Sequence, residues 1–233
     1  RGVKMPENVL EDVLFTHHQM TIQIFYNENK TTLSVKIPNF DGEFLQAELD
    51  IYHPPEDDSL NVVIPKSRNI FQVTAKHPIL PTTGFVKLGD NEYNFNADYS
   101  FAVLDYGRGI WPRQTQWNWA MASQRLGHRR IGLNFGGQWT DGTGMTENAI
   151  FVDGNMLKIH EDVIFSYDLN NMKRPWTINS KFSNHVNLKF TPFFTRTTRT
   201  DVKLFQSEVQ QFVGYFDGCV HLPGHSPIYI RQM

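Results

Sequence analysis

The sequence predicts an all-β protein built from antiparallel strands with little helix. Short runs in which apolar and polar residues alternate recur along most of the chain, and turn-forming residues separate these runs. Aromatic residues make up 13% of the composition, which suits strands and apolar cavities. Consecutive hairpins favour an up-and-down meander, and closing such a meander into a barrel would remove its exposed edges.

The first hundred residues begin with a predicted short helix over residues 5–15, because Val9, Val13 and neighbouring leucines share one helical face. The period then changes to two residues, and residues 20–26 and 32–37 are expected to form a hairpin. The remaining strands expected in this half are 44–52, 60–64, 70–75 and 85–88.

The second half repeats this rhythm, and Asp153-Gly154 is a strong hairpin signal. Its expected strands are 101–104, 117–122, 130–135, 148–152, 156–159, 163–167, 186–190, 202–209 and 212–220. With 233 residues the chain is long enough for two small β domains. We therefore predict a first β-barrel portion over residues 1–100 and a second β-barrel over residues 101–233.

Composition excludes several classes of function. The net charge of −2 provides no general basic surface, so we expect no nucleic-acid partner. A single cysteine, Cys219, rules out a disulfide framework and thiolate metal clusters, and the histidines show no zinc spacing. No apolar run is long enough to span a membrane. We expect a cytoplasmic protein without cofactor or metal, and its oligomeric state stays open.

The first candidate segment runs from Asp105 to Arg113 and follows an apolar strand. Two glycines around Arg108 allow a close backbone approach, and Arg108 and Arg113 could clamp an anion through paired hydrogen bonds. Trp111 lies between these arginines. The competing interpretation is a tight turn whose arginines pair with Asp105 or lie in solvent.

The second candidate segment is Trp117-Asn118-Trp119. On a strand, the two tryptophans face one way and the asparagine faces the other. The tryptophans would form a stacking platform for a ligand or pack in the core. A buried asparagine must be hydrogen-bonded, so Asn118 is either a structural link or a polar contact in a cavity.

The third candidate segment, residues 136–148, carries several glycines and side-chain oxygens. Three interpretations stay open: a loop bonded to its own backbone, a hard-cation site, or a catalytic rim with Asp141 or Glu147 as general acid. Thr143 and Asn148 supply further oxygens in this segment.

Residues 101–112, 117–120 and 131–149 together resemble the bacterial family catalogued as domain of unknown function 2804. The resemblance covers most of the chain and implies that family members extend beyond both of its ends. That family is similar to a lipocalin-like group that includes carotenoid hydratases, AttH-like proteins and lipocalin-type Diels–Alderases. The pattern shared with that group is Gly107, Gly109, Asn118 and Trp119. The resemblance implies two lipocalin-like β-barrels that bind apolar ligands.

Three functions follow as hypotheses: cofactor-independent hydration, isomerisation or cyclisation of a small hydrophobic molecule; a lipid carrier without chemistry; and carbohydrate binding. A desolvated acid in an apolar cavity would favour the enzyme, and an open tryptophan shelf would favour the sugar. The candidate acids are Asp105, Asp141 and Glu147. The candidate ligand contacts are Arg108, Trp111, Arg113, Trp117, Asn118, Trp119, Asn134, Trp139, Thr143 and Asn148.

Overall fold

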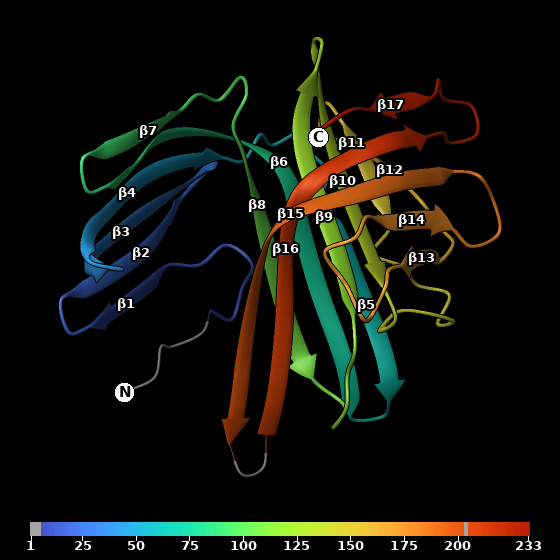
Figure 1. Ribbon diagram of the computed structural model, residues 1–233, viewed down its shortest axis with the longest axis horizontal. Coiled ribbons are helices and arrows are strands. Elements are labelled where there is room, and N and C mark those ends of the chain that lie inside the picture. Colours follow the sequence, from blue (N-terminus) through green and yellow to red (C-terminus); the bar gives the residue numbers. More distant parts are fainter. Residues whose placement is uncertain (1–5, 203–204) are drawn as a thin grey trace. The chain divides into compact units, whose positions relative to one another are not determined.

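The computed structural model describes residues 6–202 and 205–233, and every regular element within these ranges is a β-strand (Figure 1). The strands form three antiparallel sheets. The all-β antiparallel prediction is therefore confirmed. No helix in the described ranges is long and apolar enough to cross a membrane.

The first sheet contains the N-terminal strands. Its main path is β1 (Val13–His17), β2 (Met20–Asn27), β3 (Lys30–Phe40), β4 (Glu43–Tyr52), β6 (Ile70–Leu88) and β5 (Leu60–Ser67). Strands β7 (Asn91–Phe95) and β8 (Phe101–Ile110) also pair with β6, which is long enough to serve several neighbours. The predicted hairpin is present as β2 and β3, which meet at Asn27 and Lys30.

The predicted helix over residues 5–15 is wrong. Met5 lies outside the described residues, residues 6–12 are irregular, and Val13 begins β1. Val13 and Phe15 pair with Ile24 and Ile22 of β2. β-branched and aromatic residues gain more from such cross-strand pairs than from an isolated helical turn, so the neighbouring strand overrides the local periodicity.

The other two sheets use the second half of the chain. One has the order β12 (Asn155–Lys158), β11 (Ala149–Val152), β10 (Arg129–Gly137) and β9 (Asn118–Leu126). The other has the order β13 (Val163–Ser166), β14 (Trp176–Ser180), β15 (Val186–Val202), β16 (Phe205–Val220) and β17 (Ile228–Ile230). Strands β15 and β16 stand out as a long antiparallel pair (Figure 1).

The turn between β11 and β12 follows its sequence signal. Asp153 and Gly154 both have positive φ, 53° and 92°, as a tight hairpin turn requires. A side chain at position 154 would collide with Asp57, whose Oδ1 lies 2.0 Å from the place of a Cβ atom. Glycine is therefore needed here for both backbone conformation and space.

None of the three sheets forms a closed barrel among the described strands. The lipocalin-like barrel consequently stays a prediction, while the antiparallel all-β class stands.

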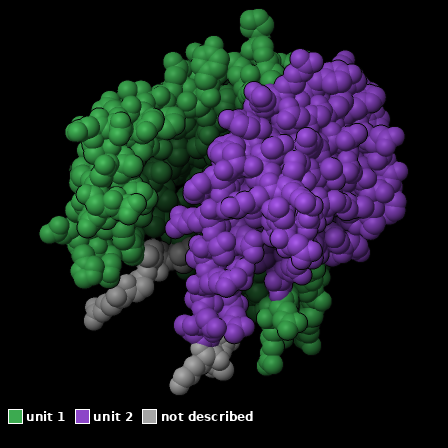
Figure 2. All heavy atoms as spheres, viewed as in Figure 1, with its two compact units in different colours: residues 1–114, 123–134, 149–157 green, residues 115–122, 135–148, 158–233 purple. Residues whose placement is uncertain are grey.

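The chain divides into two compact units, coloured separately in Figure 2. Unit 1 comprises residues 1–114, 123–134 and 149–157, and unit 2 comprises residues 115–122, 135–148 and 158–233. Each unit is thus assembled from three stretches of sequence, whereas the domain prediction used a single boundary after residue 100.

Each unit has its own buried apolar residues. In unit 1 the most deeply buried include Leu60, Ile64, Ile79, Ile131, Leu133, Ile150 and Phe151. In unit 2 they include Phe135, Ile159, Ile178, Leu188 and Ile230. Strands β5 and β15 contribute alternate positions to these cores, as the period-two pattern predicts, whereas β10 and β11 are buried at consecutive positions.

Candidate functional site

Asp105, one of the candidate acids, lies on β8 in unit 1 and pairs with a lysine. Its carboxylate is 2.5 Å from Nζ of Lys76, which is opposite it on β6 and only 4% exposed. A buried ammonium requires a counter-charge. The position of Asp105 is therefore explained by the lysine, a partner that the sequence did not indicate.

The other predicted residues of unit 1 differ in their contacts and in their exposure to solvent. Arg108 donates from Nη1 to the carbonyl of Glu7 at 2.9 Å, which ties β8 to the N-terminal segment. Trp111 is 51% exposed and Arg113 is also exposed. Asn134 is completely buried in β10, where it pairs with Ala149 of β11.

The glycine-rich loop of unit 2 bonds to itself at its exposed tip. Asp141 Oδ1 accepts a hydrogen bond from the backbone N–H of Gln138 at 2.8 Å. Thr143 Oγ1 donates to the carbonyl of Thr140 at 2.6 Å. These contacts match the interpretation of a loop whose polar side chains satisfy its own backbone.

Glu147 lies inside unit 2 and is 2% exposed. Its Oε2 accepts a hydrogen bond from the indole Nε1 of Trp139, itself 8% exposed, at 2.9 Å. Gly136 makes room for this carboxylate, because a Cβ there would lie 2.6 Å from Oε2. Burial and the indole contact assign Glu147 and Trp139 to the interior of the loop base.

Asn148 also serves the loop base. Its Oδ1 accepts from the N–H of Gly136, and its Nδ2 donates to the carbonyl of Glu161, both at 2.9 Å. The side chain is buried and uses both ends of its amide. Asn148 therefore links the loop to the segment that precedes β13.

Lys158 is a polar residue of this region that the sequence analysis missed. Its Nζ donates to Thr146 Oγ1 at 2.5 Å and to the carbonyls of Asn148 and Ile159, each at 2.9 Å. Burial lowers the pKa of Lys158 to about 8, and the negative charge of Glu147 opposes this shift. Only the fold could identify this lysine, because it ends a short strand with no local motif.

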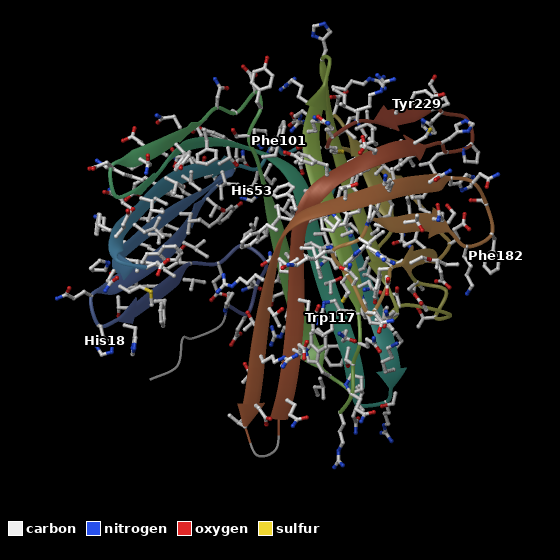
Figure 3. All side chains as sticks on the ribbon, in the orientation of Figure 1. His18, His53, Phe101, Trp117, Phe182 and Tyr229 are labelled. Atoms are coloured by element: carbon white, nitrogen blue, oxygen red, sulfur yellow. The ribbon has the colours of Figure 1, made fainter. Side chains whose placement is uncertain are left out.

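A groove of about 300 Å³ lies on unit 2, and we call it the aromatic groove. It is lined by Thr115, Gln116, Trp117, Asn118, Tyr167, Leu169, Met172, Trp176, Glu208, Val209, Gln210 and Phe212. Trp117, labelled in Figure 3, is 44% exposed. Two predicted ligand contacts, Trp117 and Asn118, thus share this groove.

Three of the four aromatic residues of the groove, Tyr167, Trp176 and Phe212, form a connected wall. The rings of Tyr167 and Trp176 have centroids 4.7 Å apart, and Trp176 meets Phe212 at the same distance in an edge-to-face arrangement. Trp176 Nε1 donates to the carbonyl of Met172 at 2.7 Å. Tyr167, Trp176 and Phe212 are held by these contacts, which prepares a fixed surface for a ligand.

The polar groups of the groove are three amides, one carboxylate and the hydroxyls of Thr115 and Tyr167. Asn118 donates from Nδ2 to Tyr167 Oη at 3.2 Å and accepts from Gln138 Nε2 at 2.6 Å. Glu208 accepts from Gln210 at 2.8 Å and forms an ion pair with Arg199. The hydrogen bonds from Gln210 and Arg199 lower the pKa of Glu208, so this carboxyl is ionised at neutral pH.

A second, smaller recess of about 150 Å³ also lies on unit 2, and we call it the carboxylate hollow. It is lined by Asn118, Gly137, Gln138, Asp141, Asp162, Val163, Ile164, Phe165 and Lys181. Asp162 Oδ2 accepts from Lys181 Nζ at 3.0 Å. The candidate acid Asp141 is therefore in the hollow, on its exposed loop, and Glu147 is not among the lining residues.

The sequence did not predict several residues of the two recesses. These are Tyr167, Trp176 and Phe212 in the groove and Asp162 and Lys181 in the hollow. The aromatic content was a general signal, but the pairing of distant segments was not visible locally. Trp119, the other tryptophan of the second candidate segment, is 37% exposed and is not part of the groove lining. Among the described residues, no group of three or more histidine, cysteine or acidic side chains could hold a metal ion.

Comparison with known proteins identifies a family without an assigned activity. No curated protein and no solved structure matches the chain. The family model described as "Domain of unknown function (DUF2804)" matches residues 1–233, as the candidate segments indicated. The chain therefore belongs to the DUF2804 family.

Proposed function

We propose that this protein is a carbohydrate-binding protein that holds a sugar ring in the aromatic groove of unit 2. The observation that carries the proposal is the lining of the groove, where Trp117, Tyr167, Trp176 and Phe212 lie beside amide side chains. Of the functions expected from the sequence, this lining favours the sugar over an apolar ligand.

The physical reason is the two-sided character of a sugar ring. Its C–H face stacks on aromatic side chains, while its hydroxyl groups both donate and accept hydrogen bonds. Gln116, Asn118 and Gln210 provide amides, which also donate and accept. A wholly apolar ligand would desolvate these amides without replacing their hydrogen bonds, at a cost in affinity.

The groove supports binding better than acid catalysis. A general acid at neutral pH needs a raised pKa, which follows from burial in an apolar site. Glu208 is the carboxylate in the groove lining, and its pKa is shifted in the opposite direction. Glu147 is buried but is engaged by the indole of Trp139.

The proposal is tested with the full chain on a glycan array, followed by calorimetric titration of the sugars that bind. Trp117→Ala should weaken binding about tenfold or more, because it removes an exposed stacking face. Trp111→Ala is the matched control, since Trp111 is similarly exposed but lies in unit 1. The control should bind as the wild type does.

Mass spectrometry of the purified protein after organic extraction tests the alternative, a carrier of a lipid-like molecule. A co-purifying lipid-like molecule that is lost in Trp117→Ala, together with no binding on the array, would overturn the sugar proposal and favour the carrier. Equal loss of sugar affinity in Trp111→Ala and Trp117→Ala would show that the sugar does not bind in the aromatic groove.

A further inference from the structure

The aromatic groove and the carboxylate hollow share one residue, Asn118. Its amide donates to Tyr167 Oη on the groove side and accepts from Gln138 Nε2 on the hollow side. The hydrogen-bonded series Tyr167–Asn118–Gln138 therefore joins a wall of one recess to a wall of the other. The two recesses are adjacent on the same unit, because Asn118 lines both.

The hollow offers mainly hydrogen-bond acceptors. Asp141 uses Oδ1 to accept from the N–H of Gln138, and Asp162 uses Oδ2 to accept from Lys181 and the N–H of Gly142. In the described part of the chain, Asp141 Oδ2 and Asp162 Oδ1 have no hydrogen-bond partner. Ionised carboxylates accept but do not donate, so these oxygens suit hydroxyl donors.

We infer that the ligand is an oligosaccharide of at least two sugar rings. One ring lies in the aromatic groove, and the hydroxyls of the next ring bind Asp141 and Asp162 in the carboxylate hollow. Asn118 lies between the two sugar rings and contacts both of them. This inference rests on the proposed function and extends it from a single ring to a linked sugar.

The charges in the hollow favour hydroxyls over an ammonium group. Two carboxylates face one lysine, and Lys181 Nζ is 3.0 Å from Asp162. An ammonium ligand would lie beside the ammonium of Lys181, and this repulsion would oppose its attraction to the carboxylates. A hydroxyl carries no charge and can also accept a hydrogen bond from Lys181.

The test compares chain lengths with matched variants of the full protein. Methyl glycosides of glucose, galactose and mannose, and their α- and β-linked disaccharides, are titrated by calorimetry into the wild type, Asp141→Asn and Asp90→Asn. Asp141→Asn keeps the Oδ1 acceptor for Gln138 and replaces the oxygen offered to the ligand. Asp90→Asn is the control, because Asp90 is exposed and lies in unit 1.

The preferred disaccharide should bind the wild type more tightly than its monosaccharide does. Asp141→Asn should weaken the disaccharide about tenfold, which is the value of one hydrogen bond to a charged group, and leave the monosaccharide unchanged. Asp90→Asn should change neither affinity. If Asp141→Asn lowers the melting temperature, Lys181→Gln provides a second perturbation of the hollow and should also weaken only the disaccharide.

The outcomes separate this inference from the proposed function. If disaccharides bind no more tightly than monosaccharides and the hollow variants have no effect, the inference of a second subsite is wrong. The proposal that the groove binds a sugar ring would still hold. If no sugar of either length binds, the proposed function itself fails. Stronger binding of methyl glucosaminide than of methyl glucoside, lost at high salt, would replace the hydroxyl assignment with a cation site.

Discussion

The glycine-rich loop and the aromatic groove of unit 2 contain similar residue types but use them differently. In the loop, Trp139 donates its indole N–H to buried Glu147. In the groove, Trp117 is 44% exposed and the neighbouring amide of Asn118 faces two recesses. At its base the loop directs Trp139 and Glu147 inward, where they hold the fold, and the groove presents its aromatic and polar groups to solvent.

The comparison shows that residue type alone does not distinguish a structural acid from a binding one. Glu147 is enclosed at the loop base, whereas Asp141, six positions earlier, lies on the exposed tip and lines the carboxylate hollow. Glu147 and Asp141 were candidate acids of equal standing in the sequence. Burial and hydrogen-bond partners separate them.

The largest expected effect is on stability at the loop base. Glu147→Leu should lower the free energy of unfolding by about 2–3 kcal/mol, because it leaves the buried indole N–H of Trp139 without its acceptor. Urea denaturation measures this loss. Glu208→Leu, at an exposed groove carboxylate, is the control and should leave the midpoint of urea denaturation close to that of the wild type. Equal losses in the two variants would contradict the contrast.

Lys158 provides a test based on pH. Its pKa is lowered from 10.5 to about 8, so between these values the unfolded chain binds more protons than the folded one. Stability from this group should therefore rise as pH increases from 8 to 10.5. Lys158→Met should abolish that rise and, at pH 7, cost about 1–2 kcal/mol because three acceptors lose their donor.

Urea denaturation of the wild type and Lys158→Met from pH 7 to 10.5 supplies the measurement. The difference between the two curves isolates Lys158 from the other groups that titrate in alkaline solution. Parallel curves over the whole range would show that Lys158 does not carry the expected pH dependence.

Glu161 extends the comparison to acid pH. Burial raises its pKa, but hydrogen bonds from Ser183 Oγ and from the N–H groups of Phe182 and Ser183 outweigh burial and lower the pKa overall. Its stabilisation is therefore present above the ordinary pKa of 4.5 and is lost as pH falls through the folded value. Glu161→Gln should cost about 1 kcal/mol at pH 7.

The same variant should unfold with a flatter dependence on pH in acid than the wild type. Circular dichroism during urea denaturation at pH 3, 5 and 7 checks this. A variant that is equally destabilised at all three values would show that the charge of Glu161 contributes nothing and that only its shape matters.

The smallest expected effect on stability belongs to the groove. Trp117→Ala should change the free energy of unfolding by about 0.5 kcal/mol or less, because exposed side chains contribute little to folding. Differential scanning calorimetry compares its melting temperature with that of the wild type. A loss above about 2 kcal/mol would place Trp117 among the structural tryptophans and leave the groove without a free stacking face.

Much of the fold was predictable because its signals are local. Alternation indicated most strands, Asp153-Gly154 indicated its hairpin, and the segments around Asp105, Trp117 and Gly136 indicated the family. The predicted helix failed because Val9, Leu10, Val13 and Leu14 fit a helical face over too few residues to compete with pairing to β2.

The candidate site was only partly predictable. Trp117, Asn118 and Asp141 were named from the sequence, and the structure places them in the linings of the groove and the hollow. Tyr167, Trp176 and Phe212 were not named, because each comes from a different segment. Asn118 and Tyr167 are 49 residues apart in the chain, yet they are hydrogen-bonded.

The sequence by itself determined that this is an antiparallel β protein of the DUF2804 family, because strand periodicity, turn chemistry and motifs depend on neighbouring residues. Only the tertiary structure decided which polar residues are buried and which are exposed to solvent. Glu147 is held inside by Trp139, and Asp105 is matched to Lys76 across two strands. Such pairings depend on burial and on contacts between distant segments, which no local pattern contains.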